Sequence, residues 1–243
     1  MTFRAAAGVI FLTRYAREAV LRVTGETRAK TAIVSHGVDS RFVNPPRPQR
    51  RIAEYSTDAP FRILYVSVVE PYKHQWCVAE AVARVRIGGL PVELELVGSA
   101  YAPSLGRLRE TLQRLDPNGE FLRYRGLVAH DVLPAMYAQA DLFVFASSCE
   151  TFGQILIEAM ASGLPVACSN RSAMPELLGD AGLYFDPENP VEMAEAIRQL
   201  VQSPELRQRS AVACFERARV YSWARCARET FAFLKVVANQ RIG

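Results

Sequence analysis

The chain has 243 residues, half of them hydrophobic, and a formal net charge of +4 at pH 7. This length can bury one substantial core and part of a second, so we expect one complete domain with a remnant attached. Nearly all basic residues are arginines interleaved with acids, which is typical of a solvated surface and argues against a nucleic-acid partner.

The first apolar segment, from Phe3 to Leu12, carries one positive charge and has the length of a short signal peptide. It lacks a convincing small-residue cleavage site, and we interpret it instead as a buried strand. No later stretch reaches the ~20 apolar residues that a membrane span requires, because Asp141 and Glu158 interrupt the longest candidates. We therefore expect a cytoplasmic protein, with a peripheral contact to the cytoplasmic side of a membrane left open.

The N-terminal region predicts a strand over 7–13, a helix over 14–24 and a second strand over 31–34. The periodic pattern then stops. Residues 44–59 carry prolines and charges without periodicity, which indicates a linker.

From Phe61 onward, short apolar runs alternate with helical segments. The predicted strands are 63–68, 92–97, 121–124, 142–146, 166–168 and 183–185, with helices expected from Lys73, after Pro103, from Asp131 and near Phe152. Repeated βα units with continuously apolar strands indicate an α/β fold, a Rossmann-like parallel sheet with helices on both faces. In such sheets ligands bind outside the carboxyl ends of the strands.

The C-terminal region predicts helices over 190–202, 204–219 and 223–238. The last of them has an apolar face too large for an isolated surface helix, formed by Trp223, Phe231, Phe233 and Leu234. We expect this helix to pack back towards the N-terminal remnant.

The most informative segment runs from Glu150 to Glu158, where two carboxylates bracket a glycine-bearing turn and the start of an apolar helix. Thr151 and Gln154 have the spacing of a capping box, which predicts a helix start near Phe152. The free N–H groups there, with the positive end of the helix dipole, suit a phosphate or a polar sugar edge.

Other strand ends supply weaker candidates. Gly153 lacks a Cβ, so a ligand could approach its backbone closely. Lys73 is a compact cation suited to a leaving diphosphate, although a solvated lysine is an equal alternative. Gly126 either allows a ligand to approach closely, with Leu127 beside it to flank a base, or is only a turn. Arg171 could meet a phosphate or be solvated.

Metal and cofactor chemistry find no support in the sequence. The five cysteines are scattered without a Cys-x-x-Cys pair, the three histidines stand alone, and there is no Asp-x-Asp pair or Gly-x-Gly-x-x-Gly fingerprint. We expect no metal, no bound cofactor and a reducing compartment.

These motifs together resemble the group 1 glycosyltransferases of the GT-B fold. The resemblance covers nearly all of 31–235 and is strongest in 145–166, where the Glu-x7-Glu segment continues into Glu-Ala-Met-Ala-x-Gly-x-Pro-Val. Further matches follow in the family's order: His36-Gly37-Val38-Asp39, Phe42, Lys73, Pro175-Glu176 and Tyr221-Ser222-Trp223.

The resemblance implies a role for each matching residue. Glu150 would contact the donor sugar, Glu158 the ribose, and Lys73 would stabilise the leaving diphosphate. The backbone amides that would hold the sugar or phosphate are those of Phe152, Gly153 and Gln154. The family mostly transfers hexoses from nucleotide diphosphate sugars with retention, and catalysis there is leaving-group stabilisation plus positioning.

Two departures from the family pattern matter. Val68 stands where the family often has a basic partner for the lysine, so a second cation is missing or comes from another residue such as Arg171. The first Rossmann-like half is reduced to residues 1–35, so the acceptor pocket is not expected in this chain. We expect 1–55 to be the remnant and linker, 56–220 the nucleotide-sugar-binding domain, and 221–243 the C-terminal helix.

The sequence thus predicts a donor-binding portion of a hexosyltransferase acting on a glycan or lipid-linked acceptor. The main alternative is a non-catalytic nucleotide-sugar-binding module that needs a separate acceptor-domain chain. A glycoside hydrolase with Glu150 and Glu158 as its carboxylate pair, and a GT-B sugar epimerase, are further alternatives.

Overall fold

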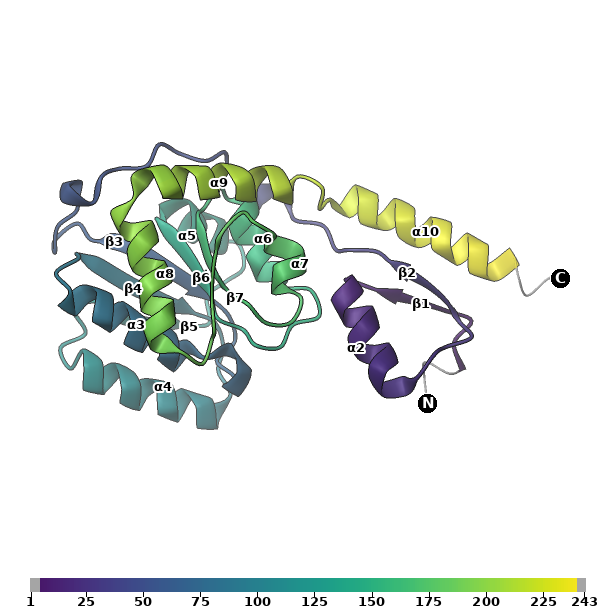
Figure 1. The fold of residues 1–243 in the computed structure, drawn as a ribbon, viewed down its shortest axis with the longest axis horizontal. Helices are drawn as coiled ribbons and strands as arrows, with labels where there is room; N and C mark the ends of the chain where they lie inside the picture. The colour runs from purple at the N-terminus through teal and green to yellow at the C-terminus, as the bar shows by residue number, and fades with distance from the viewer. Residues whose placement is uncertain (1–4, 240–243) are drawn as a thin grey trace.

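The computed structural model describes residues 5–239. Its larger part is a six-stranded sheet with the strand order β5-β4-β3-β6-β7-β8 (Figure 1). The strands are β3 (Phe61–Val66), β4 (Val92–Val97), β5 (Leu122–Gly126), β6 (Leu142–Phe145), β7 (Val166–Ser169) and β8 (Leu183–Phe185). Every pair of neighbours is parallel, which confirms the predicted sheet.

Helices cover both faces of this sheet. They are α3 (Gln75–Ile87), α4 (Ala102–Leu115), α5 (Leu133–Gln139), α6 (Gln154–Ala161), α7 (Met174–Leu178), α8 (Pro190–Gln202) and α9 (Pro204–Ala218). The chain adds strands from β3 outward to β5, returns across the sheet to β6, and then adds strands outward to β8. Because the crossovers between parallel strands are right-handed, α3 and α4 lie on one face of the sheet and α5 and α6 on the other. Accordingly α3 packs on α4 and α8, while α6 packs on α9.

The order of the strands creates a switch point between β3 and β6. These two strands are hydrogen-bonded neighbours, yet their following connections leave towards opposite sides of the sheet. A crevice at the carboxyl ends of such a strand pair is where ligands bind in open α/β sheets. The loops after β3 and β6 carry Lys73 and Glu150, which the sequence singled out.

Helices α3 and α5 each begin two residues later than expected. The helix expected from Lys73 begins at Gln75, because residues Pro71–Lys73 form a separate 3-10 turn, η3, and His74 adopts a left-handed backbone. The helix expected from Asp131 begins at Leu133. Lys73 and Asp131 therefore still lie in the segments that follow β3 and β5.

A smaller unit stands beside the main sheet. It consists of β1 (Gly8–Phe11), α2 (Arg14–Thr24) and β2 (Lys30–Ile33), and the two strands pair in parallel. Helix α10 (Trp223–Asn239) flanks the strands on the side away from α2 (Figure 1). A Cβ at Gly8 would lie 2.6 Å from Val237 and 3.0 Å from Phe233, so α10 rests directly on β1.

The chain passes between the two units at two adjacent places. Val38 bridges to Ser222, and the Val38 amide donates to the Tyr221 carbonyl at 3.2 Å. A Cβ at Gly37 would collide with the backbone of Trp223, so only glycine permits this close crossing. A further 3-10 turn, η1 (Ser40–Phe42), begins after Asp39, and Phe42 is fully buried.

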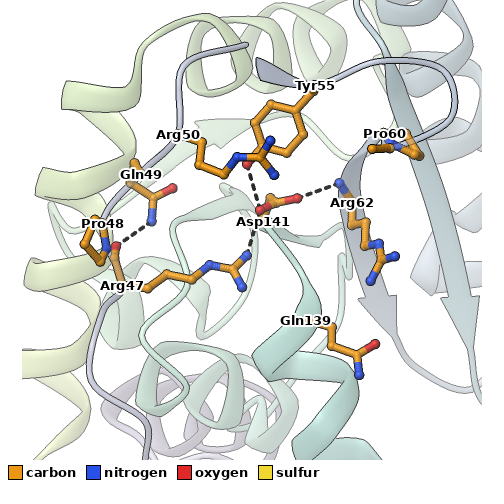
Figure 2. A pocket seen from close by; sticks show the side chains of 10 residues that line it. Arg47, Pro48, Gln49, Arg50, Tyr55, Pro60, Arg62, Gln139 and Asp141 are labelled. Carbon is orange, nitrogen blue, oxygen red and sulfur yellow. Dashed lines mark hydrogen bonds and ion pairs between the residues drawn. The ribbon is translucent and has the colours of Figure 1, made fainter. Parts of the chain in front are cut away.

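The predicted linker is extended apart from the turn η2 (Ile52–Glu54), and Asp141 holds it to the main sheet (Figure 2). One Asp141 oxygen accepts from Arg47 at 2.7 Å and from the Tyr55 hydroxyl at 2.9 Å, and the other accepts from the Arg62 amide at 2.9 Å. Charged hydrogen bonds of this kind are stronger than neutral ones. The linker is therefore fixed against the amino end of β6.

A buried arginine provides a second attachment. Arg207 on α9 is fully buried, and its guanidinium donates to the carbonyls of Leu200 and Val201 at 2.6 Å each. It also donates to the Arg50 carbonyl and, at 3.1 Å, to the Gln49 side chain. One side chain thus satisfies the C-terminal carbonyls of α8 and secures the linker.

Candidate functional site

Lys73 and Glu150 meet at the switch point between β3 and β6. The Lys73 ammonium pairs with a Glu150 carboxylate oxygen, and their side chains are only 9% and 18% exposed. The backbone of Lys73 is fixed on both sides, since its amide donates to Glu70 at 3.0 Å and its carbonyl accepts from the Tyr65 hydroxyl at 2.7 Å. The sequence proposed separate contacts for these two residues; the structure pairs them.

Aromatic rings surround this ion pair. The Lys73 ammonium lies 5.1 Å from the centre of the Tyr72 ring and 5.4 Å from that of Phe145. In such surroundings the charges interact strongly, and removing either one leaves the other uncompensated. A diphosphate that enters here would compete with Glu150 for the lysine.

The start of α6 differs from the prediction. The helix begins at Gln154 rather than near Phe152, and Gly153 occupies the position before it with φ +84°. The predicted capping box is wrong: Gln154 donates to the Gly37 carbonyl at 3.0 Å instead of closing back on the helix. The Thr151 carbonyl accepts from the Thr13 hydroxyl at 2.7 Å, so this turn is held by contacts from the smaller unit.

Gly153 and Phe152 contribute differently from what the sequence suggested. A Cβ at Gly153 would lie 2.7 Å from the Met174 side chain, so protein packing and the left-handed backbone require glycine here. Phe152 is buried, with its ring 5.5 Å from His36 and 5.8 Å from Tyr221. Its ring is therefore packed inside the protein and is not available to a ligand.

Glu158 lies on α6 and is 5% exposed. Burial raises the pKa of its carboxyl from 4.5 to about 7, although hydrogen bonds from Gln154 and Tyr137 oppose that shift. The Tyr137 hydroxyl lies 3.4 Å from the carboxylate, and the negative charge of Asp39 adds to the upward shift. A buried carboxyl that titrates near neutrality suits either hydrogen-bond donation or acceptance.

The remaining sequence candidates lie at the carboxyl ends of β5 and β7. Gly126 ends β5 with φ +72°, and Leu127 after it is 78% exposed. They share the carboxyl edge of the sheet with the pair, but β5 is two strands away from β3. Arg171 is engaged by Asp186 at 2.8 Å, so it would have to exchange partners to serve as the second cation.

Ser172 supports the Glu150 loop from the loop after β7. Its hydroxyl accepts from the Glu150 amide at 3.1 Å, and Ser172 itself has a positive φ of 55°. The sequence alone predicted neither this contact, nor the role of Tyr137 beside Glu158, nor the contact of His74 with Ser148. The only local signal was that each stands in a strand-end loop or beside an apolar helix.

The cavity in Figure 2 has a volume of about 270 Å³ and lies at the other end of the sheet. It surrounds Asp141, which precedes β6, and Arg62 at the start of β3. Its central carboxylate is already satisfied by three donors. The cavity is therefore part of the linker attachment, at the edge opposite to Lys73 and Glu150.

Residues 5–239 contain neither a cluster of metal-binding side chains nor a membrane-spanning helix. Over this range no group of three His, Cys, Asp or Glu side chains is arranged to hold a metal ion. Within the same range, no helix combines the length and the apolar character needed to cross a lipid bilayer.

The fold and the site define a Rossmann-like α/β protein whose polar residues gather at the switch point. Two solved structures share this fold. Anabaena HepE in complex with UDP and glucose superposes with a TM-score of 0.83 and 21% identity, over 97% of this chain and 65% of that one. Sucrose-phosphate synthase from Thermosynechococcus elongatus superposes with a TM-score of 0.82 and 23% identity, over 98% of this chain and 60% of that one.

The sequence comparison identifies the family. The profile described as "Glycosyl transferases group 1" matches residues 60–203, and the chain belongs to this family. It is 33% identical over 181 residues to O-antigen chain mannosyltransferase B of Escherichia coli, covering 72% of this chain and 45% of that protein. The identity is 28% over 233 residues, 95% of this chain and 58% of the relative, to the GDP-mannose-dependent alpha-(1-6)-phosphatidylinositol dimannoside mannosyltransferase of Mycobacterium tuberculosis. The chain thus spans about half the length of these curated relatives.

Proposed function

We propose that this chain is the donor-binding portion of a hexosyltransferase that takes its sugar from a nucleotide diphosphate sugar. The observation that carries the proposal is the Lys73–Glu150 pair at the switch point, with Glu158 buried on the adjoining helix. Family membership and the nucleotides named for its relatives support the same class of donor.

In this proposal the donor diphosphate displaces Glu150 from Lys73. The ammonium then neutralises the charge that develops on the leaving diphosphate, and the freed carboxylate of Glu150 accepts a hydrogen bond from a sugar hydroxyl. Glu158 accepts from the ribose, and the transfer proceeds with retention. Lysine rather than a divalent ion supplies the leaving-group stabilisation, so EDTA is expected to leave donor binding unchanged.

The acceptor is proposed to be a glycan or a lipid-linked sugar, which fits the names of the two mannosyltransferase relatives. A second candidate is a nucleotide-sugar-binding module whose acceptor half is a separate chain. The half-exposed strands β1 and β2 favour it, because parallel strands are normally covered on both faces. Transfer by this chain alone to any acceptor would refute the second candidate.

Family membership argues against the glycoside hydrolase alternative, whereas a GT-B epimerase shares this fold. Incubation of the chain with donor alone separates them. A transferase without acceptor leaves the sugar unchanged apart from slow hydrolysis, and an epimerase returns an isomeric sugar.

A calorimetric and thermal-shift panel tests the donor proposal. The panel contains UDP-glucose, GDP-mannose, UDP, GDP, uridine and guanosine. A ligand at a hundred times its Kd should raise the unfolding free energy by about 2.7 kcal/mol. Equal affinity for a nucleoside and its diphosphate would contradict the role of Lys73.

Lys73→Met sharpens this test. The variant should lose most of the difference between diphosphate and nucleoside affinity, and leaving Glu150 buried without its partner should cost about 3 kcal/mol of stability. Lys30→Met, at an exposed lysine on β2, is the matched control and should bind as the unmodified chain does.

A further inference from the structure

His74 has an unusual backbone for its residue type. It lies between η3 and α3 with φ 52° and ψ 33°, in the left-handed region. Between residues 5 and 239 only Ser172 shares a positive φ among non-glycine residues. Glycine would adopt this conformation without the steric cost that a Cβ brings. The side chain of His74 is therefore expected to make a contact that offsets this steric cost.

That side chain is 7% exposed and reaches the loop after β6. Its Nε2 atom lies 2.9 Å from the Ser148 hydroxyl oxygen. Ser148 also binds the Tyr72 carbonyl, to which its amide donates at 2.8 Å and its hydroxyl at 3.3 Å. One residue of the second loop is thus held by the two residues that flank Lys73.

These contacts join the residues that flank the ion pair in the sequence. Tyr72 and His74 stand immediately before and after Lys73, while Ser148 stands two residues before Glu150. The loops belong to β3 and β6, the strands on either side of the switch point. We call the contacts of Tyr72 and His74 with Ser148 the loop clasp.

The loop clasp differs from the ion pair in what happens when a ligand binds. A diphosphate that takes Lys73 removes the Lys73–Glu150 contact, which is the charged link between the loops. The loop clasp uses other atoms and survives this exchange. It would therefore keep the two loops in register while their charged groups change partners, so that less ordering entropy is lost on binding.

We propose that His74 is a positioning residue of the donor site, which acts through Ser148 to hold Lys73 and Glu150 in place for a nucleotide diphosphate. The inference rests on the proposed function. It deepens that function by assigning the stability of the site's geometry to a residue outside the motif of two glutamates.

The protonation state of His74 is consistent with this role. Burial lowers the pKa of its imidazole, and the positive charge of Arg107 acts in the same direction. The carboxylates of Glu188 and Asp186 oppose the shift. Because the pKa lies below its ordinary value, the ring is mainly neutral at pH 7. The Trp76 ring packs edge-on against it, with 6.2 Å between the two ring centroids.

His74→Gly separates the backbone from the side chain, because glycine keeps the left-handed turn and removes only the imidazole. Amide hydrogen exchange at Ser148, measured without ligand, should accelerate about tenfold, the value of one hydrogen bond. Calorimetry should show UDP or GDP binding weakened by up to about tenfold, with uridine and guanosine affinity unchanged. Ser148→Ala should weaken diphosphate binding similarly, and the double variant should show less than the sum of the two losses.

His74→Gln places an amide nitrogen near the position of Nε2 and should restore part of the diphosphate affinity. Ser99→Ala, at an exposed serine after the neighbouring strand β4, is the control and should change neither exchange nor binding. Unchanged exchange at Ser148 and unchanged diphosphate affinity in His74→Gly would overturn the role of His74 alone. If the unmodified chain bound neither UDP nor GDP, the donor proposal and the role of His74 would both fall.

Discussion

The two sheets of this molecule are buried to very different degrees. Every residue of β6 and β7 is buried, and the strands lie between helices on both faces. In the smaller sheet only Phe11 is buried among the residues of β1 and β2. The first sheet forms its own core, whereas the second depends on contacts with neighbouring elements.

Those contacts come largely from distant parts of the chain. The first amides of α2, those of Arg14 and Tyr15, donate to the Glu176 carboxylate at 2.9 Å each. Thr13 binds the Thr151 carbonyl, beside Glu150. The smaller unit is thus attached to the loop that carries Glu150 and to helix α7, and its position bears on the site's geometry.

The largest expected effect lies in the main sheet region. Arg207→Met keeps an apolar stem but leaves the carbonyls of Leu200 and Val201 buried without their donor. The unfolding free energy should fall by about 4 kcal/mol, from lost hydrogen bonds and packing together. Urea unfolding measures it, and Arg209→Met, at an exposed position of the same helix, should cost under about 0.5 kcal/mol. Equal losses in the two variants would contradict the bracing role of Arg207.

A pH-dependent effect should follow at Glu158. Its pKa is about 7 in the folded chain against 4.5 unperturbed, so the folded state holds the proton more tightly. The contribution of the protonated Glu158 carboxyl to the free energy of unfolding is fully present below pH 4.5 and is lost as the pH rises through about 7. The side chain in Glu158→Gln stays neutral at every pH. Above pH 7 the unfolding free energy of this variant should therefore exceed that of the unmodified chain by up to roughly 3 kcal/mol, and the difference should vanish near pH 4.

Thermal unfolding of both proteins across this pH range provides the measurement. Glu110→Gln, at an exposed position of α4, is the matched control and should leave the pH profile unaltered. A constant difference between Glu158→Gln and the unmodified chain at all pH values would show that Glu158 does not titrate as described.

A smaller effect is expected where the two units meet. Glu176→Ala removes the carboxylate that caps α2 and should cost about 1 kcal/mol. The loss should be local: amide exchange should accelerate in α2 and at Thr151, but not in α3 or β4. Glu110→Ala controls for loss of a surface charge. Uniform acceleration throughout the chain would mean that the contact contributes to global stability instead.

The smallest effect on stability should come from the outer face of α10. Phe231 is 72% exposed, whereas Phe233 on the same helix lies against Gly8. Phe231→Ser should therefore change the unfolding free energy by less than about 0.5 kcal/mol, while Phe233→Ser should cost more. Sedimentation at high protein concentration should show less self-association for Phe231→Ser, because an exposed apolar patch has been reduced.

Much of the fold was predictable because its signals are local. Strands such as β6 and β7 are continuous apolar runs, and their alternation with helices is the pattern of a parallel sheet. Helix α8 was predicted to the residue, since Asn189 caps it and proline begins it. Helix starts after strand-end loops were less predictable, because left-handed residues such as His74 and Gly153 delay them.

The site was predictable only in part, because its contacts join residues far apart in the chain. Lys73 and Glu150 were each singled out, but their pairing depends on β3 lying next to β6. The capping box failed because Gln154 finds a better acceptor in Gly37, a partner that no local pattern contains. For the same reason neither the His74–Ser148 contact nor the buried Arg207 was predicted.

The paired crossing of the chain at Val38 and Ser222 has a mechanical consequence. Two hydrogen-bonded backbone segments side by side form a hinge: they allow the smaller unit to rotate about their common axis but resist its translation along that axis. Residues on the hinge axis, such as Gly37 and Trp223, would change their separation little during this rotation. The Phe152 ring lies 5.5 Å from His36 and 5.8 Å from Tyr221, so the loop that carries Glu150 lies beside this crossing and would be displaced little by such a rotation.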